Sequence, residues 1–561
     1  MRTPSSCFMK MNIFISRIII VLGLIINISC SSEADHPITI ETDASSQEPA
    51  EIVIGERLFL ETRFAQAYYA DQNKADPALQ YTLTMDQPLR GPFAGKTMNC
   101  RACHMVDEHL EEKSAGMRSY ADFIHNSPIP DRKDGQRITP RNSMSLVNIN
   151  VASKHGVVFH FDGEFNSMED LVRATLSGRN YGWKANETAQ AIKHVADIIR
   201  KDDGKNELGK EFGGSYQRIL TATDKDIPSE FLLPENYRLD IASANDTQIF
   251  DSVARLISAY VNDLNFATDD HGNYVGSPYD QFLKLNSLPQ QPAEGESAKQ
   301  YAERLLTEVN QLKSPKYVID KNTAFKYHEQ AFLFSEKELN GLKLFLTRGS
   351  ETVRGGNCVS CHSAPHFSDY GFHNTGLSQR NYDELHGVGE FEKLTIPDLA
   401  TRDKNYNEYL PATAKHPKAS GRFRSKVDID KPGHTDLGLW NVFANPDMPA
   451  PQKKLKNIMC EQSGRSHCKA EVLLPYTMAA FKTPVLRDLG HSNPYMHNGQ
   501  FNSLEEVILF YVTNSSLLKN SSMMKSSQLL NADPELHSVN ITGRDVIPLA
   551  AFLRALNEDY E

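Results

Sequence analysis

The chain has 561 residues, 40% of them hydrophobic and 23% charged, which is a composition typical of globular proteins and a length sufficient for two or three domains. Its formal net charge at pH 7 is -11, and its Lys and Arg residues form no cluster that would offer a basic face to a phosphate backbone. These features argue against nucleic acid as a partner and favour a small basic redox protein or a neutral small molecule.

The first 30 residues have the pattern of a secretory signal peptide. Basic residues precede an apolar run, Ile18 to Ile28, which is too short to span a bilayer and is followed by Ser29 and Cys30. Cys30 resembles the lipidated cysteine of bacterial lipoproteins, so a lipid anchor, simple cleavage and an uncleaved anchor all remain open. We expect an exported protein of the periplasm, with residues 31–50 as a flexible linker.

Apolar spacing predicts two short helices in the first part of the chain, at Ile54–Phe64 and Met168–Leu176. Asn166 and Ser167 supply cap residues for the second of them, and acidic side chains in its first turn favour the helix dipole. Between the two helices lies the segment "NCRACH" at Asn99–His104.

The same pattern, N-C-x-x-C-H, returns as "NCVSCH" at Asn357–His362. Two thiols about one helical turn apart can meet the two vinyl groups of one porphyrin, and the histidine that follows can reach its iron. A thioredoxin-like pair needs no such histidine, and a structural zinc site needs four ligands. The sequence predicts two covalently bound haem c groups, held by Cys100, Cys103 and His104 and by Cys358, Cys361 and His362.

The middle of the chain, Glu187–Glu329, has helical character, and further helices are predicted at Glu336–Thr347 and Leu504–Tyr511. Strand signals are scarce. Two stretches rich in Pro, Gly, Asn and Asp, Thr268–Ser297 and Arg402–Lys454, are expected to be irregular loops. Cys460 and Cys468 flank a short polar segment, which in an exported protein predicts a structural disulfide.

Two further matches surround the haem motifs in the same order. The pattern G-x-x-L-F-L occurs at Gly55–Leu60 and Gly341–Leu346, and "FDGEFNSMEDLV" at Phe161–Val172 matches "HNGQFNSLEEVI" at His497–Ile508. These matches indicate a duplicated haem domain. The predicted fold is mainly α, with two cytochrome c-like haem domains related by internal duplication, at 51–204 and 331–561, and a helical insertion at 205–330.

The sequence resembles the bacterial dihaem cytochrome c peroxidase and MauG family. The resemblance is carried by the two haem motifs, by "RNSMSLVN" at Arg141–Asn148, by "FDG" at Phe161–Gly163 and by "FKTPVLRDLGHSNPYMHNG" at Phe481–Gly499. It implies a peroxide-using haem in the N-terminal domain, a second haem in the C-terminal domain and a calcium ion between them. For the calcium, the matching positions are Asn142, Ser492 and Pro494.

The resemblance also implies a distal ligand for the second haem. In the peroxidase branch this ligand is a methionine and in MauG a tyrosine, and the matching position here is Tyr511. A phenolate favours ferric and higher-valent iron, which points toward the MauG side. Tyr511 also continues an apolar helical stripe from Leu504, so a core role is the alternative, and Met478 and Met496 are competing ligands.

Peroxide chemistry at the first haem needs a group that moves a proton between the two oxygens. Phe161 stands where relatives carry a tryptophan, and Leu171 where they carry a glutamine. Glu187 is our first candidate for the acid and Glu169 the second, although a surface glutamate is usually only solvated. His125 is a candidate distal ligand of the first haem in a resting state, or a loop histidine on the surface.

Three functions follow from these observations. The first is a peroxidase that reduces hydrogen peroxide with electrons from a small cytochrome c or cupredoxin. The second is a MauG-like enzyme that uses peroxide on a protein side chain or another organic substrate, which Tyr511 favours. The third is a dihaem electron carrier without catalysis.

Overall fold

The structure is a computed structural model. It describes residues 48–71, 99–100, 103–104, 129, 132–134, 136, 139–151, 153–325, 330–465, 468–520 and 529–558. The predicted signal peptide, Cys30 and His125 lie outside these residues. Within them, no helix combines the length and the apolar character that crossing a membrane requires.

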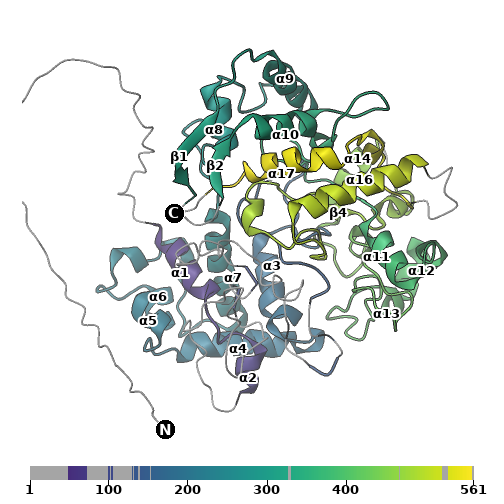
Figure 1. The fold of residues 1–561 in the computed structure, drawn as a ribbon. Coiled ribbons are helices and arrows are strands. Elements are labelled where there is room, and N and C mark those ends of the chain that lie inside the picture. Colours follow the sequence, from purple (N-terminus) through teal and green to yellow (C-terminus); the bar gives the residue numbers. More distant parts are fainter. Residues whose placement is uncertain are drawn as a thin grey trace, which may run out of the picture. The chain divides into compact units, whose positions relative to one another are not determined.

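The described part of the chain is mainly helical, as predicted (Figure 1). Its helices are α1 (Ala50–Phe59), α2 (Gln66–Ala70), α3 (Met168–Leu176), α4 (Thr188–Lys201), α5 (Glu207–Glu211), α6 (Tyr216–Thr221), α7 (Asp246–Asp263), α8 (Pro278–Leu285), α9 (Ala298–Gln311), α10 (Glu336–Leu346), α11 (Leu377–His386), α12 (Leu399–Lys404), α13 (Tyr406–Tyr409), α14 (Gln452–Gln462), α15 (Ala470–Leu473), α16 (Leu504–Asn520) and α17 (Val546–Arg554). Its strands form two short antiparallel pairs, β1 (Val318–Ala324) with β2 (Ala331–Phe334) and β3 (Phe372–His373) with β4 (Phe481–Lys482).

The helix beginning at Met168 was predicted with its observed bounds. The Ser167 hydroxyl caps it by accepting from the Asp170 amide, and Ser503 accepts from the Glu506 amide in the same way at the start of α16. α16 runs on to Asn520, well beyond the predicted end at Tyr511. α1 begins at Ala50 rather than Ile54, directly after Pro49.

The two stretches expected to be irregular contain helices, so that prediction was wrong. α8 lies inside Thr268–Ser297, and α13 lies inside Arg402–Lys454, where α14 also begins. The Ser277 hydroxyl accepts from the Asp280 amide, the Asp280 carboxylate accepts from the Ser277 amide, and Pro278 occupies the first turn of α8. This capping box starts a helix within a segment rich in turn-forming residues.

The same three-helix arrangement occurs twice. In the first half α1 and α3 both pack on α7, and in the second half α10 and α16 both pack on α17, as Figure 1 shows. The glycine of each G-x-x-L-F-L segment lies at the closest approach. A Cβ on Gly55 would come within 2.3 Å of the Leu256 carbonyl oxygen of α7, and one on Gly341 within 2.0 Å of the Pro548 carbonyl oxygen of α17. Only glycine fits either contact.

The matched "FDG" and "HNG" segments also share their backbone. Phe159 pairs with Phe165 across the first turn, and Tyr495 pairs with Phe501 across the second. Gly163 has a φ of 70° and Gly499 a φ of 66°, both in the left-handed region that glycine adopts freely. Two copies of one local structure are what a duplicated domain predicts.

The hydrophobic cores follow these helix groups. One core lies around α1, α3, α4, α6 and α7, and another around α8, α9, α10, α16 and α17. A third lies around Trp440. The segment predicted as a connecting region, 205–330, therefore supplies α6 and α7 to the first core and α8 and α9 to the second.

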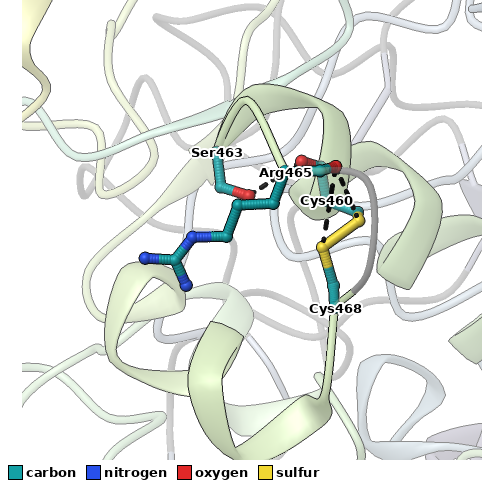
Figure 2. Close-up of a disulfide and its surroundings, with 4 residues drawn as sticks. All are labelled: Cys460, Ser463, Arg465 and Cys468. Carbon is teal, nitrogen blue, oxygen red and sulfur yellow. Dashed lines mark hydrogen bonds between the residues drawn. A yellow bond between two sulfur atoms is a disulfide. The ribbon is translucent and has the colours of Figure 1, made fainter.

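Cys460 and Cys468 form the predicted disulfide, with a Cα–Cα distance of 5.7 Å (Figure 2). The Cys460 sulfur lies 3.2 Å from the Arg465 carbonyl oxygen inside the loop that the bond closes. The disulfide fixes the segment between α14 and α15.

Candidate functional site

The two N-C-x-x-C-H segments share a pair of backbone hydrogen bonds. In each of them, the amides of the second cysteine and of the histidine donate to the carbonyl of the first cysteine. These hydrogen bonds measure 3.0 and 2.9 Å at Cys100 and 3.3 and 2.8 Å at Cys358. A single tight turn therefore carries both thiols and the histidine of each motif.

The asparagine before each motif anchors it to the fold. Asn99 donates from Nδ2 to the Leu60 carbonyl at the end of α1, at 2.9 Å. Asn357 donates from Nδ2 to the Glu535 carbonyl at 3.0 Å, and its φ of 51° is one that asparagine tolerates better than most residues. Both asparagines are buried, so each turn has a fixed position against its own helical core.

Both motif histidines are set up as metal ligands. His104 Nδ1 donates to the Met144 carbonyl at 2.8 Å, and His362 Nδ1 donates to the Phe367 carbonyl at 3.1 Å, because a carbonyl oxygen only accepts. This leaves Nε2 of each ring without a proton and with its lone pair available. Burial lowers the pKa of His104 to about 4 and also lowers the pKa of His362, so both rings are neutral at pH 7.

The four motif cysteines are not paired with one another. Burial raises the pKa of Cys100 and of Cys358 to about 12. A redox dithiol requires a lowered thiol pKa, because the thiolate is the reactive form. Neutral sulfur atoms in buried surroundings fit thioether bonds to a haem, whose sulfur carries no charge.

A buried lysine, Lys482, lies next to the "FDG" turn. Lys482 in β4 donates from Nζ to the Val158 carbonyl and from its amide to the Phe161 carbonyl, both at 2.7 Å. Burial lowers the pKa of Lys482 to about 8, and in the described part of the chain no carboxylate forms an ion pair with it. A haem propionate would supply the missing negative charge, which makes Lys482 a second observation that fits haem.

Tyr511 lies at the second motif. It packs against the core that contains α10 and α17, and burial together with the nearby Cys361 and Cys358 raises the pKa of its phenol. The competing Met478 packs instead on the core around Trp440. The helical stripe of α16 therefore brings Tyr511 both to the core and to the two cysteines, so the two roles considered for it are compatible.

A positive charge lies close to Tyr511. His373 in β3 bridges two carboxylates, with Nε2 at 2.8 Å from Asp369 and Nδ1 at 2.5 Å from Asp533. Burial opposes its charge, but its contacts with Cys361, Asp369 and Asp533 raise the pKa of His373 well above its ordinary value. The imidazolium partly opposes the rise in the pKa of Tyr511 that burial and the two cysteines cause.

The two candidate acids lie in different surroundings. Arg132 binds both carboxylate oxygens of Glu187, at 2.7 and 2.9 Å, and the Lys184 amide donates to the same group. Partial burial opposes ionisation, but these contacts lower the pKa of Glu187. Glu169 is half-buried in the first turn of α3, 3.6 Å from Arg173. Leu171, at the family's glutamine position, packs on the first core.

A buried ionic cluster joins the "FDG" turn to the second half of the chain. Asp162 is fully buried between the guanidiniums of Arg141, at 2.5 Å, and Arg424, at 3.2 Å. Arg141 also binds Asp436, and Arg424 binds Glu164. His160, Asp162 and Glu164 have ligand atoms within 4.8 Å of one another, but the two guanidiniums already supply positive charge, so we assign no metal there.

A second buried network links the "RNSMSLVN" segment to the residues that follow the second haem motif. The Tyr274 hydroxyl accepts from Asn148 Nδ2 at 2.8 Å and lies 2.7 Å from His366 Nδ1, four residues after His362. The Arg487 guanidinium lies 3.9 Å from the centre of the Tyr274 ring. The same guanidinium binds both oxygens of Asp280, each at 2.9 Å.

Two of the predicted calcium residues lie together. The Asn142 amide donates to the His497 carbonyl at 2.8 Å, and Asn142 Nδ2 donates to the Pro494 carbonyl. Ser492 stands two residues before Pro494, and its hydroxyl donates to the Asp488 carbonyl at 3.0 Å. The segment from Ser492 to Pro494 thus faces the "RNSMSLVN" segment through Asn142.

Sequence reasoning missed several residues around these sites: Lys482, His373, His366, Tyr274 and Arg487. Lys482 and Arg487 stand inside the "FKTPVLRDLG" segment that was singled out as a whole, so a charged residue in a largely apolar run was the available signal. Tyr274 had no such signal, because it lies in a stretch expected to be an irregular loop.

Comparisons with known proteins agree with the motif analysis. No family model matches the chain. Cytochrome-c peroxidase IdrP2 of Denitromonas iodatirespirans is 25% identical over 210 residues, which are 37% of this chain and 38% of that protein. Cytochrome-c peroxidase IdrP1 of Pseudomonas sp. (strain SCT) is 25% identical over 179 residues, 32% of this chain and 34% of that protein. The chain thus matches less than half the length of either relative.

Two solved structures are also similar. The diheme peroxidase BthA from Burkholderia thailandensis E264 has a TM-score of 0.40 and 16% identity, over 92% of this chain and 89% of that chain. A MauG-like protein associated with microbial copper homeostasis has a TM-score of 0.41 and 14% identity, over 94% and 96%. Because both curated relatives are named cytochrome-c peroxidases, the resemblance of this chain to cytochrome c peroxidases is confirmed.

Proposed function

We propose that this chain is an exported dihaem c-type cytochrome that uses hydrogen peroxide at the haem of His104 and shares the redox equivalents with the haem of His362. The observation that carries the proposal is the pair of equivalent Cys-x-x-Cys-His turns. Each holds a neutral histidine whose Nε2 is free to bind iron, in a chain similar to cytochrome-c peroxidases. A periplasmic location and a lipid anchor at Cys30 belong to the same proposal.

The residues of the chain have separate tasks in this proposal. A haem bound to the first motif supplies the iron at which the O–O bond of peroxide is cleaved. The Met144 carbonyl orients the His104 ring. Glu187, which Arg132 keeps ionised, accepts a proton from the inner peroxide oxygen and returns it to the outer one. Tyr511 binds the second iron, next to the positive charge of His373.

The test is the reaction of the purified holoprotein with hydrogen peroxide. Peroxide is expected to change the optical spectrum of the haems, and the protein should then oxidise a reduced small cytochrome c or cupredoxin. Glu187→Gln should slow the peroxide reaction by about 10²-fold or more, since that is the usual contribution of a general acid or base. The matched control, Glu169→Gln, should leave the rate unchanged.

Two results would contradict the proposal. A holoprotein whose haems are indifferent to peroxide would be an electron carrier without catalysis. Equal rates for wild type, Glu187→Gln and Glu169→Gln would remove both glutamates from the chemistry.

A protein that turns over with a small redox protein and shows no long-lived oxidised state would be a conventional cytochrome c peroxidase, the alternative to the MauG-like enzyme.

We further propose a calcium ion between the two halves, bound by the Asn142 side chain and the Ser492 and Pro494 carbonyls. The contact between Asn142 and Pro494 supports it, and side-chain and backbone oxygens are suitable ligands for calcium. Chelation with EGTA should slow the peroxide reaction of the wild type, and added calcium should restore it. Asn142→Ala should start slow and respond to neither reagent. A wild type that EGTA leaves unchanged, with no calcium found by elemental analysis, would rule the ion out.

A further inference from the structure

A run of oxidisable aromatic side chains leads from the first haem motif to the protein surface. The Tyr181 hydroxyl lies 3.2 Å from Cys100 Sγ, and a thioether sulfur at that position would accept its hydrogen bond. Tyr181 and Trp183 are each only 1% exposed. Tyr69 in α2 is 41% exposed, which makes it the point where the run reaches solvent.

A ring contact joins the outer two members of this run, and chain connectivity keeps the inner two close together. The centroids of the Trp183 and Tyr69 rings are 5.4 Å apart, and His194 packs edge-on against Tyr69 at 5.1 Å. Tyr181 and Trp183 are separated only by Gly182, so their Cα atoms lie at most about 7 Å apart. Gln190 Nε2 donates to the Tyr69 hydroxyl at 2.7 Å and fixes the ring at the surface.

The order of these rings, from Tyr181 through Trp183 to Tyr69, allows an electron to move in short steps. Tyrosine and tryptophan lose one electron more easily than any other aromatic side chain, and electron tunnelling slows steeply with distance. Short steps between neighbouring rings are therefore faster than one long step. Phe161, which replaces the family's tryptophan, is much harder to oxidise, so it offers no comparable intermediate stop.

Building on the proposed function, we propose that Tyr69 is a surface oxidation site for phenolic reductants, connected to the first haem through Trp183 and Tyr181. The substrates it serves are phenols too bulky to enter a haem pocket. The site adds a second place of reaction, distinct from the one where peroxide binds.

The electrons and protons balance as follows. Hydrogen peroxide takes up two electrons and two protons and leaves as two molecules of water. Each electron leaves Tyr69 by way of Trp183 and Tyr181, and the phenolic proton of Tyr69 passes to solvent. A phenol in solution then returns one electron and one proton to Tyr69 and becomes a phenoxyl radical. Two phenols are oxidised for each peroxide consumed.

The experiment treats the full-length holoprotein with peroxide and a nitroso spin trap and maps the adducts by peptide mass spectrometry. In the wild type we expect an adduct on Tyr69. It should be lost in Tyr69→Phe and strongly reduced in Trp183→Phe. Tyr476 is 50% exposed and its ring contacts Arg465, so Tyr476→Phe is a matched control that should keep the Tyr69 adduct.

Turnover with a phenol attached to a polyethylene glycol chain is measured in parallel. Tyr69→Phe should lose this activity while its haem spectrum still responds to peroxide as in the wild type. A Tyr69 adduct unaffected by Trp183→Phe, or bulky-phenol turnover unaffected by Tyr69→Phe, would overturn the surface site and leave the peroxide chemistry standing. Haems that do not respond to peroxide in any variant would instead overturn the proposed function, and this site with it.

Discussion

Replacing Arg487 by methionine should lower the free energy of unfolding by about 4 kcal/mol, because it leaves a carboxylate buried without its partner. Arg487 and Asp280 are 1% and 3% exposed, and two parallel hydrogen bonds of 2.9 Å join them. Arg487 also donates from Nε to the Pro365 carbonyl, beside the second haem motif. Thermal unfolding followed by circular dichroism is the measurement, and the midpoint should fall by on the order of 10 °C.

Neighbouring acidic side chains increase the expected loss of stability in Arg487→Met. Burial raises the pKa of Glu558 to about 8, Arg487 opposes that shift, and Asp280 and Asp488 reinforce it. Without the guanidinium, the Asp280 carboxylate would remain near Glu558 and would raise the pKa of Glu558 further. A second change, Asp280→Asn in the Arg487→Met background, removes the unpaired charge and should recover most of the stability.

A surface pair provides the control for this prediction. Arg348 binds Glu535 at 3.0 Å, but its side chain is 60% exposed. Arg348→Met should therefore cost less than about 1 kcal/mol. If Arg487→Met is no more destabilising than Arg348→Met, or if Asp280→Asn fails to rescue it, the buried pair does not hold the second half together.

Local sequence signals predicted the features that depend on local structure. The haem-motif turns, the bounds and cap of α3 and the Cys460–Cys468 disulfide each involve residues close together in the chain. Where prediction failed, longer-range contacts decided the outcome. α1 ends at Phe59, before the predicted end, and just beyond it the buried Glu61 accepts hydrogen bonds from Arg63 and from Tyr216, a residue far along the chain.

In the candidate site too, features set by adjacent residues were predicted and contacts between distant residues were not. Each Cys-x-x-Cys-His motif is visible in the sequence because five adjacent residues make it. Arg487 and Asp280 are 207 positions apart, and Tyr274 and His366 are 92 apart, so no local pattern records either contact. Tyr511 is intermediate between a visible motif and an unpredictable contact. Spacing alone assigned it to the core, and only the resemblance to a family pointed to it as a ligand.

Replacing Tyr511 by phenylalanine should abolish the low-spin signal of the second haem that we expect from histidine and tyrosine ligands. The phenol lies by Cys358 and Cys361, where burial raises its pKa and His373 only partly opposes the rise, so the positive charge of a bound ferric iron would be what stabilises the phenolate. Low-temperature electron paramagnetic resonance before and after peroxide is the measurement. Tyr495→Phe is the matched control, because Tyr495 packs on the same core while its hydroxyl donates to the Leu489 carbonyl at 2.7 Å.

Tyr511→Met separates the two branches of the family further. A thioether ligand favours the reduced iron, and axial ligands tune haem potentials over about 0.8 V, so we expect the potential of the second haem to rise by on the order of 100 mV. A higher potential favours electron transfer from a small redox protein and disfavours long storage of oxidising equivalents. Tyr511→Met should therefore turn over faster with reduced cytochrome c and lose its long-lived oxidised state. An unchanged potential and an unchanged resonance signal in both variants would return Tyr511 to a purely structural role in the core of α16 and α17.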